Sequence, residues 1–271
     1  MDRKVRFLGL FGLMTVLLSP LYAQATETAI VSPPFVYDFS SPGLLEESLT
    51  MRDSTSPYFW LNGGAELIIE DGLGKTIQSD LPPNDPWRAI YAKKNPLDTE
   101  VGSKPQNVFR LITRSEWRNF SQVITFKIIK TNFSSSYNRD GYSGIFLLSQ
   151  YKDESNYYYG GIRMDGQVVI KKKSNGVFYT LGAAQAFGSI IQFKRRNNMT
   201  LLPQDKQMRL KLETRELNQN STELILSLEK DNGSLVTLLG VVDRNPMHGT
   251  AYAGIESDFM NVVLDDYAFS K

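Results

Sequence analysis

Short runs in which apolar and polar residues alternate make up most of the chain, and glycine, asparagine, aspartate and proline separate these runs. Alternation with a period of two predicts β-strands, because successive side chains of a strand point to opposite faces of a sheet. No segment has the sustained period of a long amphipathic helix. The predicted strands cover residues 35–39, 65–70, 106–114, 121–131, 142–151, 156–164, 167–173, 177–181, 207–216, 222–230, 235–242, 251–256 and 262–270.

Strands joined by short turns pair antiparallel, because parallel pairing needs crossover helices that this pattern lacks. The sequence therefore predicts an all-β fold, an antiparallel jelly-roll β-sandwich of two packed sheets. Residues 80–105 and 183–203 interrupt the alternation and are predicted to form long loops. The strands before residue 80 are too few to close a core, so we expect one domain over residues 26–271.

The first 25 residues differ from the rest of the chain. Arg3, Lys4 and Arg6 precede an apolar run over residues 7–18, and the small-residue triplet Ala23-Gln24-Ala25 follows. This pattern predicts a secretory signal peptide over residues 1–25 and a secreted protein, extracellular or periplasmic. An uncleaved N-terminal anchor is the alternative, although the apolar run is shorter than the roughly 20 residues that a spanning helix needs.

Composition and charge exclude several classes of protein. Thirty Lys and Arg residues against 29 Asp and Glu residues give a formal net charge of +1, so no nucleic-acid-binding surface is expected. The chain has no cysteine, hence no disulfide framework, and its stability must come from its core or from a metal. Nothing in the sequence indicates an oligomeric state.

Two dipeptides, Asp165-Gly166 and Asn175-Gly176, predict two-residue type I′ hairpin turns, because both residue types tolerate positive φ angles. A two-residue turn at 165–166 pairs Ile162 with Val169 and Tyr159 with Lys172. In that register one face of the three-stranded meander is predicted to face the core, with Ile162, Met164, Val169 and Phe178. The other face is predicted to be solvated, with Tyr157, Tyr159, Arg163, Lys172 and Tyr179.

These five residues are the candidate ligand-binding set. Flat aromatic rings can stack on the apolar faces of sugar rings, while Arg and Lys donate hydrogen bonds to hydroxyls or carboxylates. The same composition is also typical of an ordinary solvated sheet face, where tyrosine is a favoured strand residue. The two interpretations agree on the fold and differ only in function.

Two segments, NYYYGGIRMDGQVVIKKK and GTAYAGIESDFMNVVLDDYAFSK, resemble the strands of laminin-G-like and concanavalin A-like lectin/glucanase sandwiches. The resemblance spans residues 36–271. It implies a polysaccharide or glycan ligand, and it leaves open whether that ligand is cleaved. A lectin-like carbohydrate-binding protein is the preferred prediction, and an extracellular protein-binding adhesion module is one alternative.

The superfamily also contains enzymes, whose motifs this chain matches only in part. The hydrolases carry a Glu-x-Asp-x-x-Glu strand for their two carboxylates, and here Glu256-Ser257-Asp258 is followed by Asn261 in place of the second Glu. Segment 114–118, Arg-Ser-Glu-Trp-Arg, is similar to a strand of alginate lyases, so a polysaccharide lyase acting on uronate polymers is the other alternative. The one histidine, His248, lies in a turn-like segment without a second histidine or cysteine for a zinc site.

A structural calcium ion is the one cofactor that the resemblance implies. Many sandwiches of this superfamily hold Ca²⁺ between the start of the chain and the last strand. Asp266 before Tyr267 resembles that ligand, with Asp38 as its partner. Calcium takes about six to eight oxygen ligands, which two carboxylates, carbonyls and water can supply.

Overall fold

The computed structural model describes residues 26–194, 200–229 and 232–271, so the predicted signal peptide lies outside the described residues. The helices and strands are β1 (Phe35–Tyr37), β2 (Gly43–Glu46), η1 (Met51–Asp53), β3 (Phe59–Gly63), β4 (Glu66–Glu70), β5 (Leu73–Thr76), α1 (Pro86–Lys94), η2 (Pro105–Asn107), β6 (Val108–Trp117), β7 (Phe120–Thr131), β8 (Gly144–Asp153), β9 (Asn156–Arg163), β10 (Gln167–Ser174), β11 (Val177–Gln185), η3 (Ile190–Gln192), β12 (Gln207–Asn218), β13 (Ser221–Glu229), β14 (Leu235–Asp243), β15 (Ala251–Asp258) and β16 (Met260–Ser270).

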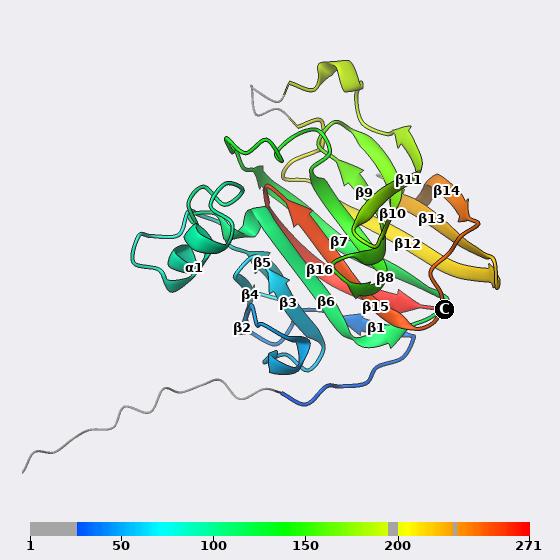
Figure 1. The fold of residues 1–271 in the computed structure, drawn as a ribbon, viewed down its shortest axis with the longest axis horizontal. Helices are drawn as coiled ribbons and strands as arrows, with labels where there is room; N and C mark the ends of the chain where they lie inside the picture. The colour runs from blue at the N-terminus through cyan, green and yellow to red at the C-terminus, as the bar shows by residue number, and fades with distance from the viewer. Residues whose placement is uncertain (1–25, 195–199, 230–231) are drawn as a thin grey trace, which may run out of the picture.

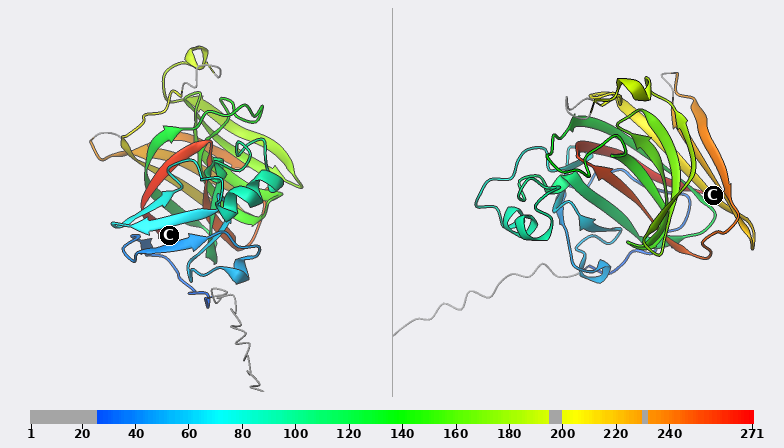
Figure 2. Two further views of the ribbon diagram at one scale, coloured as in Figure 1. Left: turned by 90° about the vertical axis from the view of Figure 1, so that its left-hand side faces the viewer. Right: turned by 45° about the horizontal axis from the view of Figure 1, so that its top comes forward.

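The strands form two antiparallel sheets, which confirms the predicted β-sandwich (Figure 1). Within the described residues, sheet A has nine strands in the order β14-β13-β12-β7-β16-β5-β4-β2, with β1 also paired to β16. Sheet B has seven described strands in the order β11-β10-β9-β8-β15-β6-β3. Both sheets combine strands from the two halves of the chain, and the two layers curve together in Figure 2.

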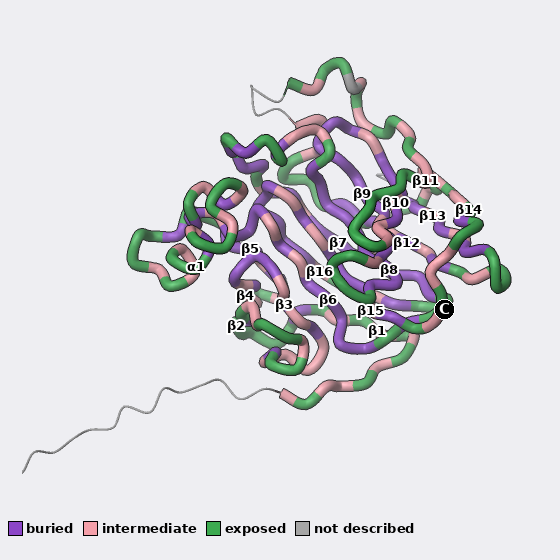
Figure 3. The backbone as a smooth tube through the Cα atoms, viewed as in Figure 1, coloured by how far each residue is buried: buried purple, intermediate pink, exposed green. Residues whose placement is uncertain are grey.

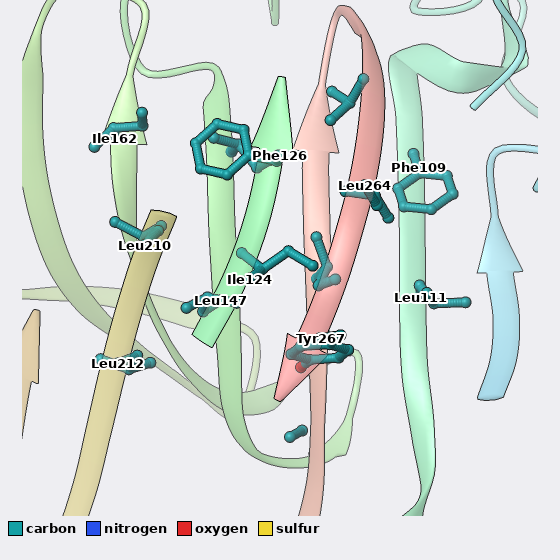
Figure 4. Packing of buried hydrophobic residues seen from close by; sticks show 14 of the residues in the cluster. Phe109, Leu111, Ile124, Phe126, Leu147, Ile162, Leu210, Leu212, Leu264 and Tyr267 are labelled. Atoms are coloured by element: carbon teal, nitrogen blue, oxygen red, sulfur yellow. The ribbon is translucent and has the colours of Figure 1, made fainter. Parts of the chain in front are cut away.

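The main core lies between the sheets, where the apolar side chains of alternate positions meet. Figure 4 shows side chains from both layers, with Ile124, Phe126, Leu210, Leu212, Leu264 and Tyr267 from sheet A and Phe109, Leu111, Leu147 and Ile162 from sheet B. All ten are buried. Figure 3 shows buried residues along the central strands and exposed residues at α1 and the turns.

One helix interrupts the predicted loop 80–105. Helix α1 spans nine residues, and the Asp85 carboxylate caps it by accepting the backbone N–H groups of Trp87 and Arg88. Pro86 begins the helix, where its missing N–H costs no hydrogen bond. Tyr91 is the one residue of α1 that is buried, so the helix carries little of the amphipathic pattern that would have revealed it. Within the described part of the chain, no helix is long and apolar enough to cross a membrane.

The β9–β10 hairpin differs by one residue from the predicted register. Ile162 pairs with Val168 and Tyr159 with Lys171, so the loop holds three residues, 164–166. Gly166 has a φ of +80°, while Asp165 is not among the residues with positive φ, which excludes a type I′ turn. At the next hairpin Ser174 pairs with Val177, with positive φ at Asn175 and Gly176, which confirms the predicted two-residue turn.

This register turns Lys172 into the interior between the sheets. Its ammonium nitrogen lies 2.7 Å from Asp243 Oδ2 and donates to the Asn245 carbonyl at 2.6 Å. The Tyr158 hydroxyl also donates to Asp243 Oδ2, at 2.8 Å. Lys172, Asp243 and Tyr158 are all buried, so the ion pair joins β10 of sheet B to the end of β14 of sheet A.

Truncation of Ile162 tests the assignment of its side chain to the core. Ile162→Ala should lower the free energy of unfolding by about 2–5 kcal/mol through lost burial and a residual cavity. Val177→Ala, at an exposed hairpin position, should change it by no more than about 0.5 kcal/mol. Urea unfolding of the two variants gives the comparison, and equal losses would contradict the observed register.

Removal of the Asp243 charge tests the buried ion pair. Asp243→Asn should lower the free energy of unfolding at pH 7 by about 3–5 kcal/mol, because it leaves the Lys172 ammonium buried without a counter-charge. Asp71→Asn, at an exposed carboxylate 3.8 Å from Lys75, is the matched control and should change it by less than about 1 kcal/mol.

The pH dependence of the same pair has a definite sign. Burial alone would raise the pKa of the Asp243 carboxyl, but the hydrogen bonds from Lys172, the Asn245 N–H and Tyr158 bring the pKa below its usual 3.8. Its contribution to stability is therefore complete above the unfolded-state pKa of about 4 and lost as the pH falls through the lower native pKa. The stability gap between wild type and Asp243→Asn should narrow below about pH 4, and a gap independent of pH would contradict this.

Candidate ligand-binding face

The outer face of sheet B, which points away from the sandwich core, carries a second layer of aromatic and apolar side chains. Ile112, Leu148, Tyr151 and Tyr157 are buried there, with Trp60, Tyr159 and Tyr252 packed against them. The Tyr151 and Tyr157 rings lie 5.7 Å apart, and the Tyr157 and Tyr159 rings 5.9 Å apart. This layer stiffens the face and leaves its more open positions near β10 and β11.

The five predicted ligand-binding residues do not share one solvated face. Tyr157, Tyr159 and Arg163 lie on the outer face, but Tyr157 and Arg163 are buried and Tyr159 is half-buried. Lys172 and Tyr179 are paired with each other across β10 and β11 and project to the opposite side of sheet B. The prediction of a shared face was wrong for these two because the hairpin loop is one residue longer than expected.

The same shift corrects the predicted core face. Ile162 and Met164 lie in the main core as expected. Val169 and Phe178 do not, because Val169 pairs with Gly161 and Phe178 with Lys173, both on the outer face. Phe178 is 52% exposed.

Arg163 has a structural role at the edge of the outer face. Its guanidinium forms a buried ion pair with Asp165 and donates from Nε to the Gly141 carbonyl at 3.3 Å. The guanidinium carbon also lies 4.0 Å from the centre of the Tyr142 ring. Arg163 therefore holds the loop before β8 and fixes Tyr142, which is 63% exposed, beside the face.

Five residues near β10 and β11 form a group that we call the Tyr159 patch: Tyr142, Tyr159, Lys171, Lys173 and Phe178. Tyr142 and Phe178 are exposed, and the other three are half-buried. The Tyr159 and Phe178 rings lie 6.0 Å apart and nearly perpendicular, at 86°. The Lys171 ammonium lies 5.5 Å from the Tyr142 ring centre and 6.0 Å from that of Tyr159. The Lys173 ammonium lies 4.8 Å from the Phe178 ring centre. Three rings and two cations thus lie next to one another, with Tyr142 contributed by the loop before β8.

Sequence reasoning missed Phe178, Lys171, Lys173 and Tyr142 as members of this site. The first three depend on the hairpin register. Tyr142 lay at the start of a predicted strand, whereas the structure places it in the loop that Arg163 holds. The Lys-Lys-Lys run was the available signal, because two residues out of three must share a face in any register.

Carboxyl groups lie toward the centre of the outer face. Glu256 Oε2 accepts from Arg110 Nε at 2.8 Å, and Asp258 follows two residues later on the same face of β15. Burial, and then the charge of Glu256, raises the pKa of Asp258 well above its usual range. Burial also raises the pKa of Tyr159, with Glu256 and Asp258 adding to the effect.

Asn261, at the position of the second glutamate in the hydrolase pattern, is buried in a network of amides. Its Oδ1 accepts from Gln106 at 3.2 Å and from Asn132 at 2.8 Å, and its Nδ2 donates to the Gln78 carbonyl at 2.8 Å. It is the second residue of strand β16 in sheet A and does not line the outer face of sheet B. The arrangement therefore gives no support to the hydrolase pattern.

The residues that resemble a lyase strand serve other contacts. Arg114 is buried and donates to the carbonyls of Thr26 at 2.8 Å and Ser56 at 2.5 Å, so it holds the first described residues against the sandwich. Arg118 pairs with Glu216 at 2.7 Å. His248 lines a cavity of about 430 Å³ with these two residues, distinct from the Tyr159 patch.

A further cavity, of about 360 Å³, lies near edge strand β3, at the opposite edge of sheet B from β11 and the Tyr159 patch. Trp60, Asn62 and Tyr151 line it together with Lys94 and Glu154. The Asn62 amide donates to the Tyr151 hydroxyl at 3.1 Å. This cavity marks where the face ends near edge strand β3.

Of the predicted calcium ligands, Asp38 directly follows β1 and Asp266 lies on β16. β1 pairs Tyr37 with Tyr267, which places Asp38 opposite Asp266 just beyond the last pair. Both aspartates are exposed, and Asp38 Oδ1 accepts the Ser40 N–H at 3.0 Å. Among the described residues, no group of three or more His, Cys, Asp or Glu side chains is placed to hold a metal ion. Calcium binding stays a prediction.

No family model matches the chain, and no curated protein matches it in sequence. Solved structures do match. Carbohydrate-binding module CBM66 from Bacillus subtilis is 13% identical with a TM-score of 0.41, covering 61% of this chain and 83% of that one. A β-glucanase from Bacillus licheniformis is 10% identical with a TM-score of 0.44, covering 88% and 98%.

A basic winged bean lectin, solved with Tn-antigen, is 9% identical with a TM-score of 0.44, covering 84% of this chain and 97% of that one. The match to a GH43 protein from Bacillus licheniformis covers 39% of that protein's length. At such identities and TM-scores the likeness carries no argument about ligand or activity.

Loss of the Arg163 charge should destabilise the fold. Arg163→Gln should lower the free energy of unfolding by about 3–5 kcal/mol, because the buried Asp165 carboxylate loses its counter-charge. The double variant Arg163→Gln/Asp165→Asn should recover part of this loss. Arg52→Gln, at a side chain 90% exposed, is the control and should have little effect. Urea unfolding gives the free energy of unfolding of all three variants. An Arg163→Gln variant with the wild-type free energy of unfolding would contradict the burial of this pair.

Proposed function

We propose that this chain binds a polysaccharide or other glycan at the Tyr159 patch and does so without cleaving it. The observation that carries the proposal is the pair of exposed rings, Tyr142 and Phe178, beside the half-buried ring of Tyr159. Exposed aromatic side chains side by side are costly to leave in water, and their flat faces suit the C–H faces of sugar rings. The lysines between them can donate to hydroxyl or acidic groups of the ligand.

The arrangement of the neighbouring carboxyl groups supports binding rather than hydrolysis. Retaining hydrolases need two carboxyl groups about 5 Å apart, one acting as nucleophile and one as acid. Glu256 is held by Arg110, and the buried Asn261 amide takes the place of the second glutamate. The leader-like residues 1–25 suit a protein that meets its glycan outside the cell.

The two neighbouring aromatic residues of β11 provide a matched test. Phe178 and Tyr179 are 52% and 49% exposed but project to opposite sides of sheet B. Phe178→Ala should weaken glycan binding about ten- to a hundredfold, since burying a phenylalanine side chain against a ligand contributes about 1.5–3 kcal/mol. Tyr179→Ala should leave the affinity nearly unchanged.

Binding is measured on a panel of polysaccharides by affinity electrophoresis and then by calorimetry, with thermal unfolding to confirm that both variants fold. Equal losses of glycan affinity in the two variants would show that the ligand does not bind at the Tyr159 patch. A wild-type protein that binds no member of the panel would contradict the proposed function itself.

A further inference from the structure

We propose that the glycan bound at the Tyr159 patch is acidic, with carboxylate or sulfate groups that pair with the ammonium groups of Lys171 and Lys173. The inference rests on the proposed function, and it names the class of glycan. It starts from the two cations of the patch, both half-buried on the outer face of β10.

These two lysines differ from the other cations of this region in having no acidic partner. Arg110 pairs with Glu256 at 2.8 Å, Lys172 pairs with Asp243 at 2.7 Å, and Arg163 forms its ion pair with Asp165. Neither Lys171 nor Lys173 forms a salt bridge with a carboxylate of the described residues, and each lies over aromatic rings instead. Their charges are therefore available to a ligand.

The surrounding charges do not cancel this positive patch. Asp140 and Asp165 act on Lys171 from beyond salt-bridge distance. Asp140 Oδ1 accepts the Tyr142 N–H at 2.7 Å, and Asp165 is held in its ion pair with Arg163. Glu256 lies on β15, three strands from β10 and so about 14 Å away, which exceeds the screening length of about 8 Å at physiological salt. Burial, followed by the charge of Arg163, lowers the pKa of Lys171. A nearby anion would reverse that effect and stabilise the ammonium form.

The spacing of the two lysines suits a polymer. They are two residues apart on one strand face, so their Cα atoms lie about 7 Å apart along β10. Tyr159 flanks Lys171, and Phe178 flanks Lys173. Successive sugars of an extended acidic chain could place rings against these aromatic side chains and acidic groups against the ammonium groups. A neutral hydroxyl would offset the partial desolvation of each ammonium less well than an anion does.

The test compares polymers that share a sugar backbone and differ in their charged groups. Dextran and dextran sulfate form one pair, and polygalacturonate and its methyl ester form the other, which separates sulfate from carboxylate recognition. Wild-type protein should bind at least one acidic polymer roughly tenfold more tightly than its neutral counterpart at 50 mM NaCl. Most of this difference should disappear at 500 mM NaCl, where the charges are screened.

The variant Lys171→Gln/Lys173→Gln assigns the preference to the patch. It should lose most of the preference for the acidic polymer, while Lys130→Gln, at an exposed lysine on β7 of sheet A, should keep it. Phe178→Ala should weaken binding to acidic and neutral polymers alike. Thermal unfolding checks that each variant is folded, and a variant that fails this check is replaced by the single substitutions.

The outcomes separate the inference from the proposed function. Equal binding of charged and neutral polymers, unchanged by the double substitution, would overturn the acidic class and leave glycan binding in place. A preference for acidic polymers that the double variant retains would overturn the role of these lysines. Absence of binding to any polymer, neutral or acidic, would overturn the proposed function and this inference together.

Discussion

The hydrogen-bond register between β9 and β10 determines what the outer face of sheet B can do. A three-residue loop that ends at Gly166 sets this register, and a Cβ atom at Gly166 would lie 1.9 Å from the Phe187 carbonyl. With a period of two, each side chain of β10 is then assigned to one face. Lys172 turns inward and contributes to the fold, while Lys171 and Lys173 turn outward. The same rule, carried across the next hairpin, places Phe178 beside Lys173.

A register shifted by one residue would be electrostatically costly. It would turn Lys171 and Lys173 inward in place of Lys172, and Asp243 supplies one carboxylate for two ammonium groups. An unpaired ammonium buried between the sheets would cost several kcal/mol. In the observed register the inward residues of β10 are Val168, Ile170 and the paired Lys172. The ion pair joins residues 71 positions apart in sequence, so this constraint on a local hairpin is a long-range one.

The sequence predicts the sandwich and most of its strands because alternation with turn residues is a local signal. The short strands β2, β3 and β5 were not predicted. The Asn175-Gly176 turn is equally local and was predicted in full. The β9–β10 register was not predicted, because Val168, Val169 and Ile170 are all apolar and the next three residues are all lysine. In addition, Asp-Gly suits both a two-residue and a three-residue loop.

Burial of Arg163 depends on Asp165 and on the loop at Gly141 folding over it, which strand periodicity cannot show. Helix α1 was missed because its nine residues bury only Tyr91, although Asp85-Pro86 is a helix start signal.

Different strands of the outer face carry its buried aromatic residues and its accessible side chains. On β8 and β9 the rings of Tyr151 and Tyr157 pack on one another and are buried, which gives the sheet a second buried layer besides the main core. Toward β10 and β11 the rings and ammonium groups are more open, and the closed layer next to them restricts their motion. A ligand that meets side chains already held in place loses less conformational entropy on binding than one that must order them. For the proposed binding, the buried tyrosines would contribute through the rigidity that they give to Tyr159.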